Sequence, residues 1–439
     1  MQRISRREFV KRTAVTTAAF TSLPAFLAAC GESTGSNKVT KLVVAAVQGN
    51  EDGPLKKVVG NYKSETGIEV QVVEFPYDSL YSKLVTTFQA NDSSYDLSMM
   101  DDPWMPKFGT MGALQPLDSN FGFTRDPDIP AVVYDVGTWP PPSGPVPPTE
   151  QSKAKHLYGI TIVGNVEMFM YRSDKSAAPT SWTDVLANAA KYNAANFYGY
   201  VIRGKATNPV SSDSLPILWS FGGNVFDDTW KVQLDSAASI TAVDFLTRKL
   251  KQYAEPGAES FDAAERSQAM ATGKAYQSTV WPGEITGIVE DPTVSQVKGK
   301  VAYIPIPQGP SGKGVAMMGN WLLGIPKGSK QGQAAADFIK WMLKADKMRN
   351  YVAQGGIPIR NSILNDASLA SANPYFKSLA ASFAAVPNWR PRTDQWGAVE
   401  TSYGTAMNAA VAGLMTPAAA MQKAAGEIRT LMKAANYPS

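Results

Sequence analysis

The pattern in residues 41–100 indicates the fold class of this chain: KLVVAAVQGNEDGPLKKVVGNYKSETGIEVQVVEFPYDSLYSKLVTTFQANDSSYDLSMM. Apolar runs at 42–46, 68–75 and 95–100 predict three short buried strands. The two stretches between them carry apolar residues at helical spacing, and the first of these begins at Pro54. Strands that alternate with helices form a parallel sheet, because each helical crossover returns the chain to the same direction. The sequence therefore predicts an α/β fold.

Polar residues follow the first and third predicted strands. Gln48 and Asn50 come after the first strand, and Asp101, Asp102 and Trp104 come after the third. In open α/β sheets ligands lie beyond the carboxyl ends of the strands, where such loops converge. Amides and carboxylates bind hydroxyl groups, and an aromatic ring offers a flat apolar face to the C–H surface of a polyhydroxyl ligand. These five residues are our first ligand-binding candidates.

The α/β pattern continues through the rest of the chain. The further predicted elements are a strand at 167–171, a helix near 183–192, a helix around 240–250, a strand at 301–306, a helix at 333–347 and Ala-rich helices after Trp396. Residues 137–148 are rich in proline, which predicts an exposed loop. No apolar stretch of 18 residues follows the N-terminal segment, so no membrane span is predicted there.

The first thirty residues resemble an export signal with a lipid attachment site. Arg6 and Arg7 precede Phe-Val-Lys as in a twin-arginine signal, and an uncharged stretch at 13–29 ends in Leu-Ala-Ala before Cys30. We interpret 1–29 as a signal peptide, Cys30 as the lipidated cysteine of a lipobox, and the polar residues up to 40 as a flexible tether. The alternative is that Cys30 is a small buried residue of a signal helix.

Composition excludes several classes of function. The net charge of +4 is carried by residues 1–29, so the rest of the chain is neutral and a nucleic-acid partner is not expected. Cys30 is the only cysteine and His156 the only histidine, which argues against a disulfide, thiol catalysis, a cysteine or histidine metal site and a Ser-His-Asp triad. We expect His156 at the surface, and no metal or cofactor.

Several short motifs occur in a characteristic order. They are Tyr95-Asp96-Leu97 before Asp101-Asp102-Pro103-Trp104, Gly112 to Asp118, Tyr158-Gly159-Ile160-Thr161, Pro179-Thr180-Ser181-Trp182, Trp219 with Phe221-Gly222-Gly223, Val280 to Glu284, Gly319-Asn320-Trp321, Gly355 to Arg360, and Trp389-Arg390-Pro391 before Trp396. Each motif is weak alone, but in this order they resemble the family 1 extracellular solute-binding proteins over nearly the whole chain after the signal.

The resemblance implies a fold and a function. The fold is the type II periplasmic-binding-protein fold, in which two lobes, each a mixed, mostly parallel sheet flanked by helices, close about a hinge. We expect lobe 1 at 41–156 plus 305–344 and lobe 2 at 157–304 plus 345–439. The function is capture of a mono- or oligosaccharide or polyol by an exported, monomeric protein, lipid-anchored at the outer face of the cytoplasmic membrane, for the permease of an ABC importer.

The matching segments add further ligand-binding candidates: Asn165, Glu167, Trp219, Trp281, Glu284, Asn320, Trp321, Arg360 and Trp396. Each also has a structural interpretation. Buried tryptophans usually belong to the core, an acidic residue after a strand can cap a helix, and Arg360 can form an ion pair between segments.

Two rival functions stay open at this point. A secreted carbohydrate-active enzyme could use paired carboxylates such as Asp102 and Glu284 as acid and nucleophile or base. An adhesion or scaffold lipoprotein would bind no small molecule saturably and would not close. Turnover of a glycoside separates the first rival from a binding protein, and saturable binding separates the second.

Overall fold

The computed structural model describes residues 38–385 and 387–438. The predicted export signal with Arg6 and Arg7, the lipidated Cys30 and most of the tether lie outside the described residues. Within the described ranges no helix has both the length and the apolar character that a membrane crossing requires.

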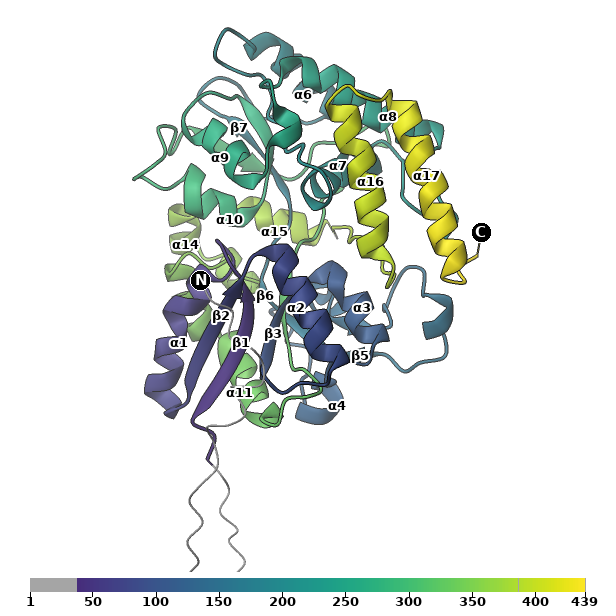
Figure 1. The fold of residues 1–439 in the computed structure, drawn as a ribbon. Helices are drawn as coiled ribbons and strands as arrows, with labels where there is room; N and C mark the ends of the chain where they lie inside the picture. The colour runs from purple at the N-terminus through teal and green to yellow at the C-terminus, as the bar shows by residue number, and fades with distance from the viewer. Residues whose placement is uncertain (1–37, 386, 439) are drawn as a thin grey trace, which may run out of the picture. The chain divides into compact units, whose positions relative to one another are not determined.

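The first lobe is built on a five-stranded sheet with the strand order β2-β1-β3-β10-β6 (Figure 1). Its strands are β1 (Lys41–Val47), β2 (Glu69–Phe75), β3 (Leu97–Asp101), β6 (Gly159–Val163) and β10 (Trp321–Gly324). β1 pairs in parallel with both β2 and β3, whereas β10 runs antiparallel between β3 and β6. The predicted mixed sheet is confirmed for this lobe, with two parallel and two antiparallel pairings.

Helices on both faces explain why β3, β6 and β10 are buried at every position, whereas β2 at the edge of the sheet is partly exposed. The helices of this lobe are α1 (Gly53–Thr66), α2 (Tyr77–Gln89), α3 (Met105–Thr110), α4 (Leu117–Phe121), α5 (Ala131–Asp135) and α11 (Gly332–Leu343), with a single 3-10 turn, η2 (Asp102–Trp104), before α3. The ring of Tyr62 in α1 packs against Phe338 and Trp341 of α11, with centroids 5.0 and 5.3 Å apart. α1 ends at Gly67, whose φ of +77° suits a residue without a side chain.

The second lobe contains a three-stranded sheet with the order β8-β7-β9. Its strands are β7 (Met168–Arg172), β8 (Gln277–Val280) and β9 (Val301–Ile304), and its helical elements are α6 (Trp182–Tyr192), α7 (Asn208–Ser220), α8 (Ala237–Asp244), η4 (Phe245–Leu250), η5 (Lys251–Tyr253), η6 (Ala258–Ser260), α9 (Ala263–Ala271), α10 (Pro282–Glu284) and η7 (Ile285–Val289). Both pairings of this sheet are antiparallel. The expectation of a mostly parallel sheet is therefore wrong for the second lobe.

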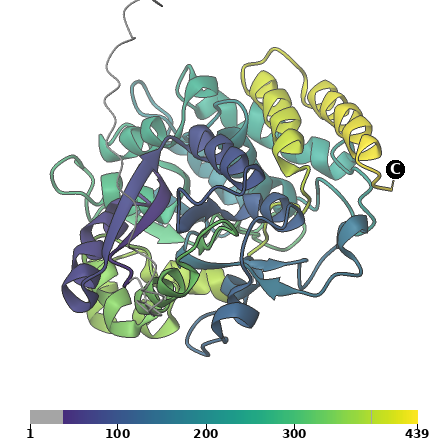
Figure 2. The ribbon, with the colours of Figure 1, turned by 60° about the horizontal axis from the view of Figure 1, so that its bottom comes forward.

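The C-terminal part of the chain is helical. Its helices are α12 (Ala345–Ala353), α13 (Asn361–Leu364), α14 (Ala367–Ala372), α15 (Phe376–Ala384), α16 (Trp396–Val411) and α17 (Pro417–Ala434). α16 and α17 lie side by side (Figure 2), and α16 also packs against α7 of the second lobe. α12 instead packs against α1 and α11 of the first lobe.

Two of the expected lobe boundaries differ from these contacts. β6 belongs to the first sheet although the second lobe was expected to begin at 157, and α12 packs on the first lobe although residues from 345 onward were assigned to the second. The physical reason is the same in both places. The position of each element is set by a partner distant in sequence, which a local pattern does not reveal.

Three chain segments run beside one another where the lobes join. Glu167 N donates to the Met317 carbonyl at 2.9 Å, and Gly319 N donates to the Asn165 carbonyl at 3.0 Å. On the other side, Met318 N donates to the carbonyl of Asn388 at 2.8 Å. These ladder-like bonds connect β7, β10 and the segment that precedes α16, so the join between the lobes is a small ribbon of backbone.

The proline-rich segment is more ordered than its composition predicts. β4 (Thr138–Trp139) pairs with β5 (His156–Leu157), and a single 3-10 turn, η3 (Pro148–Glu150), lies between them. Trp139 is 1% exposed and donates from Nε1 to Glu150 Oε2 at 3.0 Å. The prediction of an exposed loop is therefore wrong for its first residues, because the indole ring anchors them. His156 is half-buried, with Nδ1 3.3 Å from Asp118 Oδ2.

Candidate functional site

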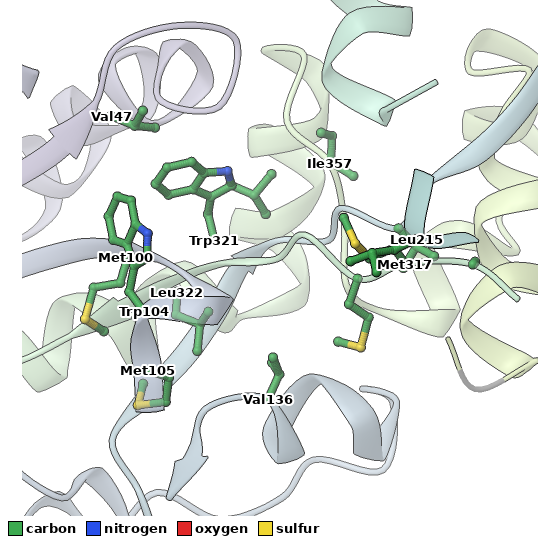
Figure 3. Packing of buried hydrophobic residues seen from close by; sticks show 14 of the residues in the cluster. Val47, Met100, Trp104, Met105, Val136, Leu215, Met317, Trp321, Leu322 and Ile357 are labelled. Atoms are coloured by element: carbon green, nitrogen blue, oxygen red, sulfur yellow. The ribbon is translucent and has the colours of Figure 1, made fainter. Parts of the chain in front are cut away.

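An aromatic cluster lies at the carboxyl end of the first sheet. Trp104 follows β3 and Trp321 begins the neighbouring β10, and their rings meet edge to face with centroids 5.6 Å apart (Figure 3). Tyr77, at the start of α2, lies 5.0 Å from Trp104 and 6.0 Å from Trp321. The two tryptophans are each 6% exposed. The structure thus brings together two predicted stacking residues and adds a tyrosine that the sequence did not single out.

Asp101, the last residue of β3, is the centre of a hydrogen-bond network beside these rings. Its carboxylate accepts two bonds from the guanidinium of Arg390, at 2.8 and 3.1 Å, and one from the Tyr77 hydroxyl at 2.8 Å. Burial raises the pKa of Tyr77 well above its usual value, so this hydroxyl keeps its proton and donates. A two-point guanidinium–carboxylate contact fixes the orientation of both groups.

Asp102 is fully buried next to this network. Its Oδ2 accepts from the backbone N–H of Asn320 at 3.0 Å, and Arg392 donates to its carbonyl at 3.0 Å. Burial raises the pKa of Asp102 to about 7, although Arg390 acts in the opposite direction. The side chain of Asn320, also a predicted site residue, is fully buried and donates to Thr161 at 3.4 Å.

The second lobe reaches the network through α7 and α16. Asn208, the first residue of α7, donates to Glu400 Oε1 at 3.1 Å and to the Tyr77 hydroxyl at 3.5 Å. Glu400 lies in α16, which begins at the buried Trp396. Burial raises the pKa of Glu400 to about 7, and the nearby Asp101 carboxylate adds to the shift. Polar groups of both lobes therefore meet around one hydroxyl.

The loop after β1 approaches the second lobe on another side. A side chain placed on Gly287 would come within 3.0 Å of Asn50 Oδ1, so these two residues are in close contact. The neighbouring Glu51 is half-buried, and its charged neighbours include the carboxylates of Glu284 and Asp101. Burial raises the pKa of Glu51 to about 7, and these two carboxylates raise it further. Of the two residues predicted in this loop, Asn50 makes the inter-lobe contact, and Gln48 is exposed.

Trp281 packs directly on the backbone that joins the lobes. It follows β8 and is half-buried. A methyl group added at Gly319 would lie 2.6 Å from its ring, which means that only a glycine allows this approach. Asn165, another predicted residue, lies beside Gly319 and is buried with its side-chain oxygen unpartnered among the described residues.

Two predicted carboxylates belong instead to a buried cluster inside the second lobe. Arg266, which is fully buried, pairs with Glu284 and with Asp213 of α7, and donates to Thr279 at 3.0 Å. The carboxylate of Glu167 lies 4.0 Å from the same guanidinium. Burial raises the pKa of Glu167 well above its usual value. This cluster connects α7, α9, β8 and α10.

Two other predicted residues lie away from the network. Arg360 bonds Asp126 and Asp128 at 2.5 and 2.9 Å, which agrees with its structural interpretation. Trp219 donates to Asn224 at 3.3 Å and lines a separate cavity.

Sequence reasoning missed several members of the network, namely Glu51, Tyr77, Asn208, Arg390 and Glu400. A signal was present for one of them. Arg390 stands between a tryptophan and a proline in one of the motifs that carry the family resemblance, and a buried arginine requires a partner. Asn208 and Glu400 lie on helices whose polar positions give no local indication of what they face.

The network offers carboxylate, guanidinium, amide and phenol groups beside indole rings. Such a set can donate to and accept from several hydroxyls at once while the rings cover an apolar face. Among residues 38–385 and 387–438 no group of three histidine, cysteine, aspartate or glutamate side chains is arranged to hold a metal ion. The polar groups and indole rings of the network favour recognition of a polar organic solute.

Comparisons with known proteins agree with this geometry. A family model described as bacterial extracellular solute-binding protein matches residues 46–349. Over 388 residues the chain is 25% identical to a probable amino-acid ABC transporter periplasmic-binding protein of Sinorhizobium fredii, with 86% of each chain covered. It is also 25% identical to the mannitol-binding protein of Pseudomonas aeruginosa, covering 90% of this chain and 94% of that protein.

Solved structures share the fold. A ribitol complex of an ABC transporter solute-binding protein from Agrobacterium radiobacter has a TM-score of 0.77 at 23% identity, with 89% of this chain and 98% of that chain covered. A maltose-bound protein of T. maritima has a TM-score of 0.78 at 24% identity, with 89% and 99% covered. The expected two-lobed fold is confirmed.

Proposed function

Because the chain belongs to the bacterial extracellular solute-binding proteins, we propose that it captures a sugar or polyol between its lobes and delivers it to the permease of an ABC importer. The relatives named for mannitol, ribitol and maltose support this solute class. No cofactor is needed for this role, since binding and release require only contacts that change with closure.

The observation that carries the proposal is the network shared by the two lobes. Tyr77 and Asp101 belong to the first lobe, and Asn208 of the second lobe reaches the Tyr77 hydroxyl at 3.5 Å. A solute that binds to both sets of groups has more contacts in the closed arrangement than in the open one. It therefore shifts the equilibrium towards closure by the difference in binding free energy.

Binding without turnover is the second part of the proposal. The rival enzyme needs two free carboxylates across a glycosidic bond. Glu284 is engaged by Arg266 and Ser267 in the buried cluster, and Asp102 accepts from the Asn320 backbone. Both carboxylates thus have structural partners, which supports a recognition role for this protein.

The cellular setting is proposed from the sequence. The paired Arg6 and Arg7 support export, and Cys30 supports a lipid anchor on the outer face of the cytoplasmic membrane. The protein would act there as a monomer. Metabolic labelling with a fatty-acid probe tests the anchor: the parent should carry the label and Cys30→Ala should not, and equal labelling of both proteins would contradict the anchor.

A ligand screen tests the function itself. Purified protein is heated with maltose, D-mannitol, ribitol and D-tagatose, and with a panel of amino acids, because one relative is named for an amino-acid transporter. A true ligand at a hundredfold excess over its Kd stabilises the folded state by about 2.7 kcal/mol, and the midpoint rises saturably. A shift only with an amino acid would reassign the solute, and release of product from maltose would overturn binding without turnover.

Two variants make the screen site-specific. Trp321→Ala should abolish or weaken the shift, because it removes an aromatic face of the network. Arg248→Ala is the control, since this side chain is 70% exposed and its ion pair with Asp244, at 3.5 Å, lies at the surface. Equal loss of the shift in both variants would contradict the assignment of the site.

A further inference from the structure

The cavity that Trp219 lines lies between the proline-rich connection of the first lobe and the second lobe. It has a volume of about 240 Å³, and three tryptophans from separate segments, Trp219, Trp230 and Trp389, line it. Ser143, Gly144 and Pro145 close it from the first lobe. None of the tryptophans described at the candidate site, Trp104, Trp281, Trp321 and Trp396, is among its lining residues. The cavity is therefore a separate space, although Arg392 in its wall also donates to the carbonyl of Asp102.

The backbone of Trp230 is in a conformation that tryptophan rarely adopts. Its φ is +69°, in the left-handed region where a side chain is strained. The indole is fixed from two sides: Nε1 donates to the Val146 carbonyl at 3.3 Å, and the ring meets Tyr437 edge to face at 5.0 Å. Glycine adopts this backbone conformation without strain. The contacts of the indole ring are what a glycine at this position would lack.

The cavity also holds a buried cation with an unsatisfied donor. Arg392 is 3% exposed, and its two terminal nitrogens donate to the carbonyls of Asp102 and Val136 at 3.0 and 2.8 Å. Its Nε has no partner among the described residues. This Nε atom is itself covered by protein atoms, so the guanidinium contributes its positive charge to the cavity wall and not a free donor.

Carboxylate and amide side chains also line the cavity. Asp228 is exposed, and Asn224 and Asn388 also line the cavity. The Arg392 guanidinium lies 5.5 Å from the centroid of Trp389, so the same ring is in contact with the cation and with the cavity. Indole faces together with carboxylate, amide and guanidinium groups make the combination that polyhydroxyl ligands require.

We propose that this cavity is a second carbohydrate-binding site, which takes one sugar ring or a short polyol. The cavity is too small for an oligosaccharide. Its volume of about 240 Å³ is below the roughly 300–1,000 Å³ of pockets that enclose drug-sized ligands. Its lining comes from both lobes, so an occupant contacts both and favours the arrangement in which they meet here.

Fluorine NMR on the full chain labelled with 5-fluorotryptophan tests the proposal. The resonances of Trp230, Trp389 and Trp321 are assigned by single tryptophan-to-phenylalanine variants, and D-glucose, D-mannitol and maltose are titrated separately. We expect Trp230 and Trp389 to shift saturably with at least one monosaccharide or polyol. Trp341, which packs against Phe338 in the first lobe with centroids 6.1 Å apart, is the internal reference and should not move.

Two further variants separate this site from the first one. In Asp101→Asn, which weakens the network between the lobes, the Trp230 and Trp389 shifts should persist with an unchanged midpoint. Trp389→Ala should weaken binding at the second site by at least about tenfold, because it removes an aromatic anchor, and should leave the Trp321 titration in place.

Two outcomes would overturn the second site. One is the absence of shifts at Trp230 and Trp389 with all three probes. The other is shifts that follow Trp321 at every concentration and vanish in Asp101→Asn. If the proposed function itself is wrong, the resonance of Trp321 does not shift with any probe. This result distinguishes that failure from a failure of the second site.

Discussion

Two buried arginines in this protein have the same chemistry but different surroundings. Arg266 is fully buried and pairs with Asp213 and Glu284, all within the second lobe. Arg390 is 2% exposed and pairs with Asp101, which is itself joined through Tyr77 to a helix of the other lobe. The first cluster connects elements that do not separate when the lobes move. The second lies where the lobes meet, so the same kind of ion pair can respond to a solute.

The largest change in stability should come from breaking the first cluster, the one around Arg266. Arg266→Met leaves the Glu284 carboxylate buried without its cation and leaves Asp213 with Arg203 alone at 3.4 Å, and Glu167 loses a neighbouring charge. Removing one partner of a buried ion pair costs about 3–5 kcal/mol. We expect a loss of that size in the free energy of unfolding from urea titration. The solute affinity of the fraction that stays folded should change little.

The control for Arg266 is Arg248→Ala. Its exposed ion pair should contribute less than about 1 kcal/mol. A loss of stability in Arg266→Met no larger than in this control would show that the buried cluster is not structural.

Breaking the second cluster should change solute binding, which breaking the first cluster should leave nearly unchanged. Asp101→Asn keeps the size of the side chain but removes the charge that Arg390 and the Tyr77 hydroxyl bind. Hydrogen bonds to charged groups contribute about 1.5–3 kcal/mol, so we expect the solute affinity to fall about 10- to 100-fold. Calorimetric titration with the solute found in the ligand screen measures it. Unchanged affinity, with a stability loss like that of Arg266→Met, would erase the difference between the clusters.

The same contrast explains what could be predicted from the sequence. β1 to β3 and the loops after them follow from local apolar patterns, and those loops do contain Asp101, Asp102 and Trp104. The partners of these residues do not follow, because Arg390 is 289 positions from Asp101 in the chain and only the fold brings them together. For the same reason Glu284 could be singled out, but its engagement by Arg266 could not be foreseen. The ligand contacts of the predicted residues stay predictions.

Acid pH should stabilise the protein, because carboxylates near the network prefer their protonated form. The pKa of Glu400 and that of Asp102 are each raised to about 7, mainly by burial. The folded chain therefore binds these protons more tightly than the unfolded chain, and unfolding releases them. The free energy of unfolding should fall as the pH rises from about 4 to 7 and level off above 7. Urea titrations at pH 5 and pH 8 measure the difference.

The variant Glu400→Gln tests how much of this pH dependence of the free energy of unfolding comes from Glu400. The variant cannot ionise, so we expect its stability to differ less between pH 5 and pH 8 than that of the parent, by about 1–2 kcal/mol. Glu427→Gln is the control, because Glu427 is 47% exposed and the hydrogen bond from Lys423 lowers its pKa. A slope in Glu400→Gln equal to that of the parent would exclude Glu400 as its source.

The smallest effect should come from Glu51, which lies close to carboxylates of both clusters. Glu284 belongs to the first cluster and Asp101 to the second, and both raise the pKa of Glu51, which reaches about 7 mainly through burial. At pH 8 the ionised Glu51 is repelled by both, so Glu51→Gln should stabilise the chain by up to about 1 kcal/mol. At pH 5 Glu51 is already protonated, and the variant should match the parent. If Glu51→Gln is less stable than the parent at pH 8, a cation between the clusters holds the ionised Glu51. The two clusters would then form one connected ion-pair network.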